Sequence, residues 1–369
     1  MDDHIKARDI LINSVGIVET ERVKTEELFG RIIACDIKAG EDVPSFARSP
    51  YDGYAFRADD TKGASKDRGV TLKVIENIRA GELPVNKVTE GRAIRLMTGA
   101  IIPEGADAVC KYEDTTVNAS NNCDHNSIID AHDHDTSVTI YKEYRAGDNV
   151  IRPGEDMQKG RVLALSGSVC DTGLMGAVAS LGITELAVYK RPVAGIISTG
   201  DELVDIDAPV PPGKIRNSNR YTISAALKRA GADPVYLGHA KDDVKDICSL
   251  IDRGFEECDL LVCTGGVSAG DYDLVPDAMK EYGYELLVQG VGIKPGMACA
   301  YGVRQGKLML ALSGNPASAL TNLQCVTLPA IRKLCGHREY DHKLIRLKLL
   351  NDFNKAGGGT RFIRGRMEI

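Results

Sequence analysis

The chain has 369 residues, of which 43% are hydrophobic and 27% charged, and its formal net charge is -6. This length exceeds that of a usual single core and predicts two or more domains. The acidic balance, without Lys- or Arg-rich runs, excludes a typical nucleic-acid-binding protein, because no phosphate-binding footprint is present.

The polar N-terminus and the lack of an eighteen-residue apolar run favour a cytoplasmic protein without a membrane span. The ten cysteines form no C-x-x-C pair and lie mostly in apolar stretches. We therefore expect them to be reduced, buried thiols.

The sequence pattern of the first 190 residues changes twice. Residues 5–29 predict a helix followed by a strand-turn-helix piece, and residues 147–189 hold Gly-punctuated segments with a helical stretch from Leu174 to Ser180. We expect 1–46 and 147–189 to pack together as a discontinuous, helical N-terminal scaffold domain. The short β-branched runs of residues 47–146, separated by Gly, Pro and Asn, predict an inserted all-β domain.

The second half of the chain reads differently. Residues 190–338 alternate apolar strands with amphipathic helices, which predicts an α/β domain with a parallel sheet, helices on both faces and ligands at the carboxyl ends of the strands. Residues 339–369 read as β again, in KLIRLKLL. They are too few for a self-sufficient domain, so we expect a short C-terminal β domain that is truncated or rests on a partner.

Three predicted strand ends in the α/β region carry glycine beside polar residues. The segments are Thr199 to Glu202, Thr264 to Asp273 and Ser313 to Pro316. Glycines let main-chain amides approach a ligand, and a helix that starts just after them offers free N–H groups to an anion. Carboxylates in the same crevice need a counter-charge, most simply Mg²⁺ bridging substrate phosphates. Neither a Walker A nor a G-x-G-x-x-G pattern is present, which disfavours ATP hydrolysis and Rossmann dinucleotide binding.

Seven ordered motifs resemble those of the molybdopterin molybdotransferases, the family of MoeA and the gephyrin E domain. They are Ser49 to Ala55 (SPYDGYA), Gly154 to Asp156 (GED), Ser198 to Leu203 (STGDEL), Asn217 to Asn219 (NSN), Thr264 to Asp273, Ile293 to Gly296 (IKPG) and Ser313 to Pro316 (SGNP). The resemblance runs to about Arg366. It implies four domains and a homodimer whose site combines the α/β domain of one subunit with elements of the other.

The resemblance also implies the activity, which is insertion of molybdate into adenylylated molybdopterin with release of AMP. The substrate could be handed over by the adenylyltransferase that precedes this step. Acids would hold Mg²⁺ against the pyrophosphate, while cations and helix N-termini would hold molybdate. The implied catalytic residues are Asp52, Asp156, Glu202, Asp271 and Lys294.

The metal ligands implied by the family are Glu202, Asp271 and Asp242 or Asp243. The implied substrate-binding residues are Thr199, Gly200, Asp201, Asn217, Ser218, Gly265, Gly266, Ser268, Gly270, Ser313, Gly314 and Asn315. Two structural alternatives stay open. Asp52 lies in an Asp-Gly pair, which is also an ordinary turn signal, and Asn217 and Ser218 are also good helix caps.

Three departures from the family pattern bear on activity. Met297 stands where the family usually has a second basic residue, and Ser313 stands where it usually has proline. Most of the last domain is also missing. Arg304 or an arginine of the C-terminal tail could supply the charge that Met297 lacks.

Two other functions compete with the insertase. An enzyme that performs the preceding adenylylation shares the α/β domain, but the inserted β domain and the SPYDGYA segment argue against it. A catalytically weak pterin-binding or scaffold protein is supported by Met297 and the short tail.

The most metal-like cluster lies in the inserted domain. Its spacing is irregular and fits no zinc pattern, so we expect a solvated hairpin loop. The cluster comprises Cys123, Asp124, His125, His132, Asp133, His134 and Asp135.

Overall fold

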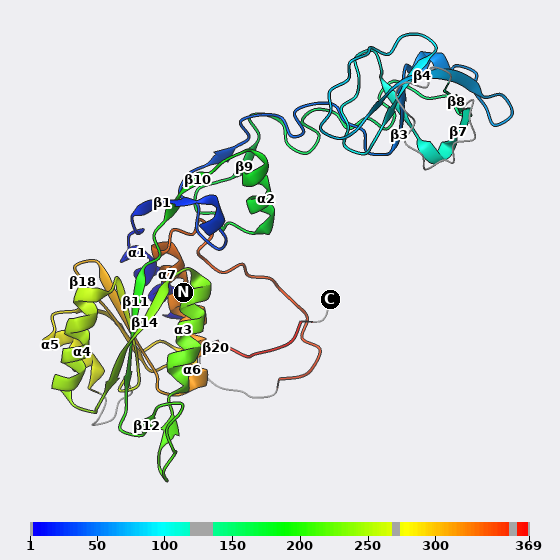
Figure 1. The fold of residues 1–369 in the computed structure, drawn as a ribbon. Coiled ribbons are helices and arrows are strands. Elements are labelled where there is room, and N and C mark those ends of the chain that lie inside the picture. The colour runs from blue at the N-terminus through cyan, green and yellow to red at the C-terminus, as the bar shows by residue number, and fades with distance from the viewer. Residues whose placement is uncertain (1–2, 119–135, 268–273, 354–359, 368–369) are drawn as a thin grey trace. The chain divides into compact units, whose positions relative to one another are not determined.

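A computed structural model of the chain describes residues 3–118, 136–267, 274–353 and 360–367. The chain divides into two compact units (Figure 1). Met1–Ile37 with Ala164–Ile369 form what we call the α/β unit, and Lys38–Leu163 form the β unit. The metal-like cluster of cysteine, histidine and aspartate lies outside the described residues. None of the described helices is both long and apolar enough to span a bilayer.

The β unit is built on a six-stranded sheet in the order β6-β3-β5-β4-β8-β7. Neighbouring strands are antiparallel except β4 and β5. Tyr54 and Phe56 of β3 belong to one apolar cluster and Ala55 to another, so side chains cover both faces of the sheet. The bounds are β3 Gly53–Phe56, η2 Ala58–Thr61, β4 Val70–Ile78, β5 Arg92–Leu96, β6 Ala108–Lys111, η3 Tyr112–Asp114, β7 Thr115–Asn118 and β8 Ser137–Ile140.

The α/β unit contains a second six-stranded sheet, in the order β14-β11-β15-β19-β18-β16. The first four of these strands are parallel, whereas β18 is antiparallel to β19, and β16 to β18. The predicted parallel sheet is therefore confirmed, with two antiparallel pairings added at one edge. The bounds are β11 Val193–Thr199, β14 Asp233–Ala240, β15 Leu260–Thr264, β16 Glu285–Gln289, β18 Cys299–Arg304 and β19 Lys307–Leu312.

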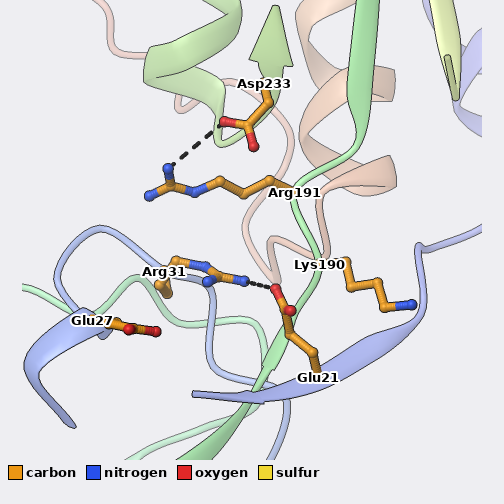
Figure 2. Close-up of a pocket in the computed structure, with 6 residues that line it drawn as sticks. All are labelled: Glu21, Glu27, Arg31, Lys190, Arg191 and Asp233. Carbon is orange, nitrogen blue, oxygen red and sulfur yellow. Dashed lines mark hydrogen bonds and ion pairs between the residues drawn. The ribbon is translucent and has the colours of Figure 1, made fainter. Parts of the chain in front are cut away.

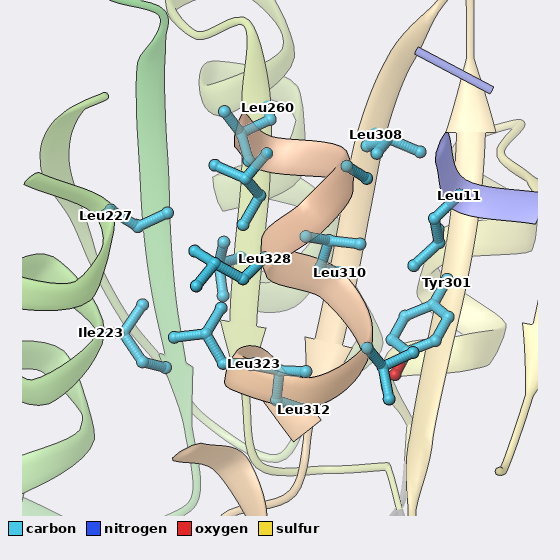
Figure 3. Close-up of a cluster of buried hydrophobic side chains, with 14 of the residues drawn as sticks. Leu11, Ile223, Leu227, Leu260, Tyr301, Leu308, Leu310, Leu312, Leu323 and Leu328 are labelled. Carbon is cyan, nitrogen blue, oxygen red and sulfur yellow. The ribbon is translucent and has the colours of Figure 1, made fainter. Parts of the chain in front are cut away.

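Helices cover both faces of this sheet (Figures 1 and 3). Alternate residues of β15 point to opposite faces, since Val262 packs with the α3 and α7 side chains while Leu261 and Cys263 pack with those of α4 and α5. Burial on both faces explains the almost uninterrupted apolar strands of the sequence. The bounds are α3 Ser218–Ala230, α4 Val244–Glu257, α5 Val275–Glu281, α6 Pro316–Asn322, the π-helix η4 Leu323–Thr327 and α7 Leu328–Leu334.

The N-terminal helix α1 (Asp3–Asn13) belongs to the core of this sheet. Ala7 and Leu11 are buried in the same cluster as Leu328 of α7 (Figure 3). Strand β1 (Thr20–Lys24), not the helix, pairs with the 147–189 segment, through β10 (Glu185–Tyr189). The prediction of a helix after β1 was wrong, because a single 3-10 turn, η1 (Thr25–Glu27), follows the strand.

Shorter elements complete the described chain. The helical stretch predicted at residues 174–180 is confirmed as α2 (Thr172–Ser180), which Asp171 caps by accepting a hydrogen bond from the Leu174 amide. The remaining strands are β2 Ile37–Lys38, β9 Val162–Ala164, β12 Leu203–Val204, β13 Ile215–Arg216, β17 Ile293–Lys294 and β20 Thr360–Arg361.

The C-terminal tail does not contain the strand that the sequence predicts. Residues 343–350 are irregular, and Leu344 is 89% exposed. Apolar alternation favours a strand only where a neighbouring strand accepts its hydrogen bonds. In the described part of the tail, this happens only at β20, which pairs in parallel with β17.

Two helical glycines of the α/β unit should respond oppositely to a side chain. A Cβ at Gly254 would lie 2.4 Å from Leu261 Cδ2 and 2.6 Å from Leu237 Cδ1, whereas a Cβ at Gly176 would meet no atom within 4 Å. We predict that Gly254→Val destabilises the protein by about 1–3 kcal/mol. Gly176→Ala should stabilise it by about 0.5–1 kcal/mol. Urea unfolding followed by circular dichroism tests both, and equal effects would contradict the packing described.

Candidate functional site

The carboxyl ends of β11, β15 and β19 meet at one edge of the α/β sheet. Ser198 pairs in register with Thr264, and Thr264 with Leu312. The Thr199 hydroxyl donates to the Thr264 carbonyl at 3.3 Å, and the Gly265 amide donates to the Leu312 carbonyl at 3.0 Å. The structure thus brings together the predicted loops that begin at residues 199, 264 and 313. Ser268, Gly270 and Asp271 lie outside the described residues.

Glycine is required where these loops touch. At Gly265, with φ +96°, a Cβ would lie 2.5 Å from the Thr199 carbonyl oxygen. At Gly200, with φ +124°, it would lie 2.4 Å from Glu202 Oε2. At Gly265 both the left-handed backbone and the close approach to main-chain atoms exclude a larger residue, whereas at Gly200 the backbone conformation alone favours glycine, because the Glu202 side chain is flexible. The Glu202 carboxylate therefore folds back over the Gly200 main chain.

Two asparagines organise the helices that start at this edge. Asn217 accepts a hydrogen bond from the Arg220 amide at 3.2 Å and donates to Ser198 Oγ at 2.8 Å. Asn315 accepts from the Ala317 and Ser318 amides at 3.0 and 3.1 Å. The capping alternative for Asn217 is therefore confirmed, and its amide also ties α3 to the end of β11.

Asn219 is a site residue whose role the sequence analysis missed. Its side-chain amide donates to the Gly314 carbonyl at 2.9 Å and joins the start of α3 to the loop after β19. The NSN motif contained Asn219, but nothing in the sequence indicated a partner 95 residues away.

Acidic residues line the same edge. The Asp201 amide donates to Asp242 Oδ2 at 3.4 Å, and Lys214 Nζ donates to the Asp201 carbonyl at 2.7 Å. Asp243 instead caps α4, because its Oδ1 accepts from the Lys245 and Asp246 amides. Of the two adjacent aspartates, Asp242 therefore lies with the Gly200–Glu202 loop.

Lys294 lies on β17, and its side chain is exposed. Among the described residues, no carboxylate lies within ion-pairing distance of its ammonium group. The Gly296 carbonyl accepts a hydrogen bond from Asn322 Nδ2 at 3.0 Å, which joins this loop to α6. Because α6 follows β19 directly, the lysine segment is held against a helix of the strand-end site. Met297 is 67% exposed.

Arg304 does not supply the charge that Met297 lacks. It pairs in register with Lys307, at the start of β19, whereas Cys299 at the other end of β18 pairs with Leu312. Arg304 therefore lies at the sheet edge opposite the strand-end loops. Its guanidinium carbon is 4.4 Å from the centre of the Phe255 ring and 4.3 Å from that of Tyr282. Of the tail arginines, Arg361 pairs in register with Lys294.

The β unit holds the other two predicted acids. Asp52 Oδ1 accepts hydrogen bonds from the Thr98 amide at 2.6 Å and the Thr98 hydroxyl at 2.8 Å. These bonds, followed by the charge of Arg95, lower the pKa of Asp52. Asp156 forms an ion pair with Arg48 at 3.5 Å, and its exposure makes that pair weak. Thr98 was not singled out from the sequence, because it carries no local signal.

A charged hollow of about 430 Å³ lies elsewhere in the α/β unit (Figure 2). Its cations already have acidic partners. Arg31 pairs with Glu21, and Arg191 with Asp233 at 3.7 Å. Asp233 and Arg191 lie at the amino ends of β14 and β11, the edge opposite the strand-end loops. This hollow is a neutralised groove, whereas the strand-end edge presents glycines, helix starts and a lysine without an ion-pair partner among the described residues.

The fold and this edge define an α/β protein with glycine loops and helix starts gathered at the carboxyl ends of parallel strands, the place where proteins of this class bind ligands. Two family models match the chain. Residues 4–182 match the MoeA N-terminal region (domain I and II), and residues 195–333 match a probable molybdopterin binding domain.

Similar proteins cover nearly the whole chain. A molybdopterin molybdenumtransferase of Staphylococcus epidermidis is 33% identical over 369 residues, which are 100% of this chain and 82% of that protein. One from Staphylococcus aureus is 35% identical over 359 residues, covering 97% and 82%. The crystal structure of a Pyrococcus molybdopterin biosynthesis MoeA protein superposes with a TM-score of 0.71 at 34% identity, covering 90% of this chain and 80% of that one. The chain therefore belongs to the MoeA family of molybdopterin molybdenumtransferases.

The contact between Asp52 and Thr98 predicts a measurable titration. Because its pKa is lowered, the Asp52 carboxylate stabilises the fold at neutral pH, and this contribution is lost as the pH falls through the lowered value. Carbon-detected NMR should find the Asp52 midpoint below the ordinary value of about 3.9. Thr98→Val should raise it, because the hydroxyl donor is lost. Thr71→Val, in the same sheet, is the control, and an unmoved midpoint in Thr98→Val would show that the hydroxyl is irrelevant.

Proposed function

We propose that this chain transfers molybdenum by inserting molybdate into adenylylated molybdopterin, with release of AMP. The observation that carries the proposal is the convergence of Gly200, Gly265 and Gly314 on one strand-end edge with the starts of α3 and α6. Main-chain amides and positive helix ends at such an edge suit the pyrophosphate of the substrate. The full-length similarity to molybdenumtransferases supports the same reaction.

The roles of the residues follow from their charges. Loop glycines and Thr199 would let the phosphates approach the main chain, with Asn217, Ser218, Ser313 and Asn315 at the helix starts. Lys294, which has no carboxylate partner in the described chain, would attract molybdate, an oxyanion. No covalent nucleophile is required. Most of the rate would come from placing the oxyanion beside the dithiolene.

The acidic residues fit a hard divalent cation by their donor chemistry. Glu202 and Asp242 offer carboxylate oxygens on the Gly200 loop and beside it, and Asp271 belongs to the adjacent loop sequence. In the part of the chain that the structure describes, no three such side chains are gathered into a preformed metal site. We therefore propose that substrate phosphates provide further ligands. When bound, Mg²⁺ would neutralise charge on the pyrophosphate.

The remaining assignments extend the same proposal. Asp52 and Asp156 of the β unit would contribute acids to the site, which in a homodimer combines elements of two subunits. We divide the chain into a scaffold (1–46 and 147–189), an inserted β domain (47–146), a molybdopterin-binding domain (190–338) and a C-terminal segment (339–369). The proposed setting is the cytoplasm, with the substrate delivered by an adenylyltransferase and with no nucleic-acid or membrane partner.

Neutralising the acids should slow turnover strongly without unfolding the protein. We predict that Glu202→Gln, Asp271→Asn and Asp52→Asn each lower Mg²⁺-dependent AMP release from adenylylated molybdopterin by on the order of 10² or more. Asp207→Asn, an exposed acid of the segment between β12 and β13, is the matched control. Wild-type turnover in two of the three variants would refute the site. Release of AMP also separates this activity from adenylylation, which consumes ATP.

Met297 provides a second test, because a lysine there would add a positive charge three residues from Lys294. A hydrogen bond to a charged group contributes about 1.5–3 kcal/mol, so Met297→Lys should tighten molybdate binding about tenfold or more. Pterin affinity should change little. Met297→Leu controls for the loss of methionine. Equal molybdate affinities of wild type and Met297→Lys, titrated at low and moderate salt, would mean that the charge is already supplied. If the wild-type protein binds molybdate very weakly and Met297→Lys restores binding, the result would favour the catalytically weak pterin-binding or scaffold protein as the interpretation of the native chain.

A further inference from the structure

A buried polar pair interrupts the apolar core on the α3 and α7 face of the sheet. Tyr301, in the middle of β18, is fully buried, and so is Asn322, the last residue of α6. The Tyr301 hydroxyl donates to Asn322 Oδ1 at 2.5 Å. Figure 3 shows the Tyr301 ring next to Leu11 at one side of the apolar cluster, which also contains Leu312 and Leu323.

This pair also forms a hydrogen bond to a main-chain group of the loop that follows Lys294. Asn322 Nδ2 donates to the Gly296 carbonyl at 3.0 Å, two residues after Lys294. The loop is pressed onto α6 at this point, since a Cβ on Gly296 would lie 3.2 Å from the Ser318 carbonyl oxygen. A continuous chain of contacts thus runs from β18 through Tyr301 and Asn322 to the loop.

The chemistry of the pair fixes which group donates and which accepts in each of these hydrogen bonds. Burial raises the pKa of Tyr301 far above its ordinary value, so the hydroxyl remains a donor at physiological pH. With its Oδ1 occupied by that donor, Asn322 must direct its Nδ2 group toward an acceptor. Two apolar side chains would fill the same space without the cost of burying polar atoms. What the polar pair provides in addition is the tether to Gly296.

We propose that Asn322, oriented by Tyr301, is a positioning residue that fixes the Lys294–Gly296 segment against α6 and thereby sets where the Lys294 ammonium meets molybdate. The part that concerns molybdate rests on the function proposed above, whereas the tether itself does not. Lys294 has no carboxylate partner among the described residues, and the main chain on either side of it determines its position. Besides the Asn322 tether, the Lys294 carbonyl accepts from the Phe362 amide at 3.1 Å, and the Met297 carbonyl accepts from the Val291 amide at 3.0 Å.

The competing interpretation is that the pair only stabilises the core. A double substitution separates the two, because Tyr301→Phe with Asn322→Leu replaces both polar partners with apolar groups of similar shape. Removing both partners of a buried hydrogen bond can be nearly neutral for stability, whereas removing one leaves the other unsatisfied. The double variant should therefore melt higher than Asn322→Leu alone, and any remaining loss against wild type is that of the Gly296 carbonyl, which lacks its donor in both variants.

If Asn322 positions Lys294, catalysis should not recover in the double variant even where stability does. In the double variant, kcat/KM for molybdate should fall about tenfold, as expected for loss of a well-oriented contact, with KM for the pterin unchanged. In a Lys294→Ala background, the same double substitution should have no further effect on turnover, because the group that it positions is absent. Thr327→Val is the matched control. It removes the buried hydrogen bond from Thr327 to the Leu323 carbonyl, in the same helical segment but away from the loop.

Amide hydrogen exchange tests the tether without any turnover. Exchange in the peptide covering residues 290–298 should quicken several-fold in the double variant and in Tyr301→Phe, and should stay at the wild-type rate in Thr327→Val. If the double variant is too unstable to compare, the Tyr301→Phe variant, which keeps the aromatic ring, provides the same test of exchange in residues 290–298.

The outcomes distinguish the tether from the proposed reaction. Wild-type exchange in the double variant and in Tyr301→Phe would overturn the inference, whatever the protein's activity. Faster exchange with unchanged molybdate kinetics would overturn the positioning of Lys294 in the reaction. Faster exchange in a protein whose wild type releases no AMP would support the tether and refute the proposed function.

Discussion

The parallel alignment of β11, β15 and β19 is the constraint on which the site depends. Parallel strands in register end at the same edge, so three loops that begin 65 and 49 residues apart in sequence must share one small space. Their backbones come so close that a single methyl group at Gly265 would overlap the Thr199 carbonyl. Packing and backbone conformation therefore favour glycine at these turns even without a ligand. The same close approach leaves main-chain groups, not bulky side chains, at the edge.

Burial of the sheet on both faces places the polar chemistry at its rim. Strand residues of β15 and β19 are apolar because helices cover both faces, and a polar group there would need a buried partner. Tyr301 and Asn322 form such a pair, and it leads outward to the loop of Lys294. At the opposite edge, charged residues such as Arg31 and Glu21 neutralise one another (Figure 2). In the part of the chain that the structure describes, the two edges of the sheet thus differ in whether their charges are already paired.

The β unit shows how a turn signal and a functional signal can coincide. Asp52 lies in an Asp-Gly pair, and its carboxylate accepts two hydrogen bonds from Thr98, which lies in a different turn 46 residues away. Only Oδ1 takes part in the hydrogen bonds from Thr98, so Oδ2 is not committed to that contact. A carboxylate held by neutral donors keeps its charge at neutral pH. The structural and the catalytic interpretation of Asp52 are therefore compatible.

The sequence by itself determined the strand-helix order of the α/β unit, the β-rich N-terminal region and the family, because apolar periodicity and ordered glycine motifs are local properties of the chain. It also indicated helix capping as one of two possible roles of Asn217. Tertiary structure decided which residues meet. Asn219 contacts Gly314 across 95 residues, and Thr98 contacts Asp52 across 46. Arg304 lies at the wrong edge for an oxyanion because β18 runs antiparallel to β19, a fact that no local pattern encodes. The tail failed as a predicted strand for the same reason, since a strand depends on the neighbour with which it pairs.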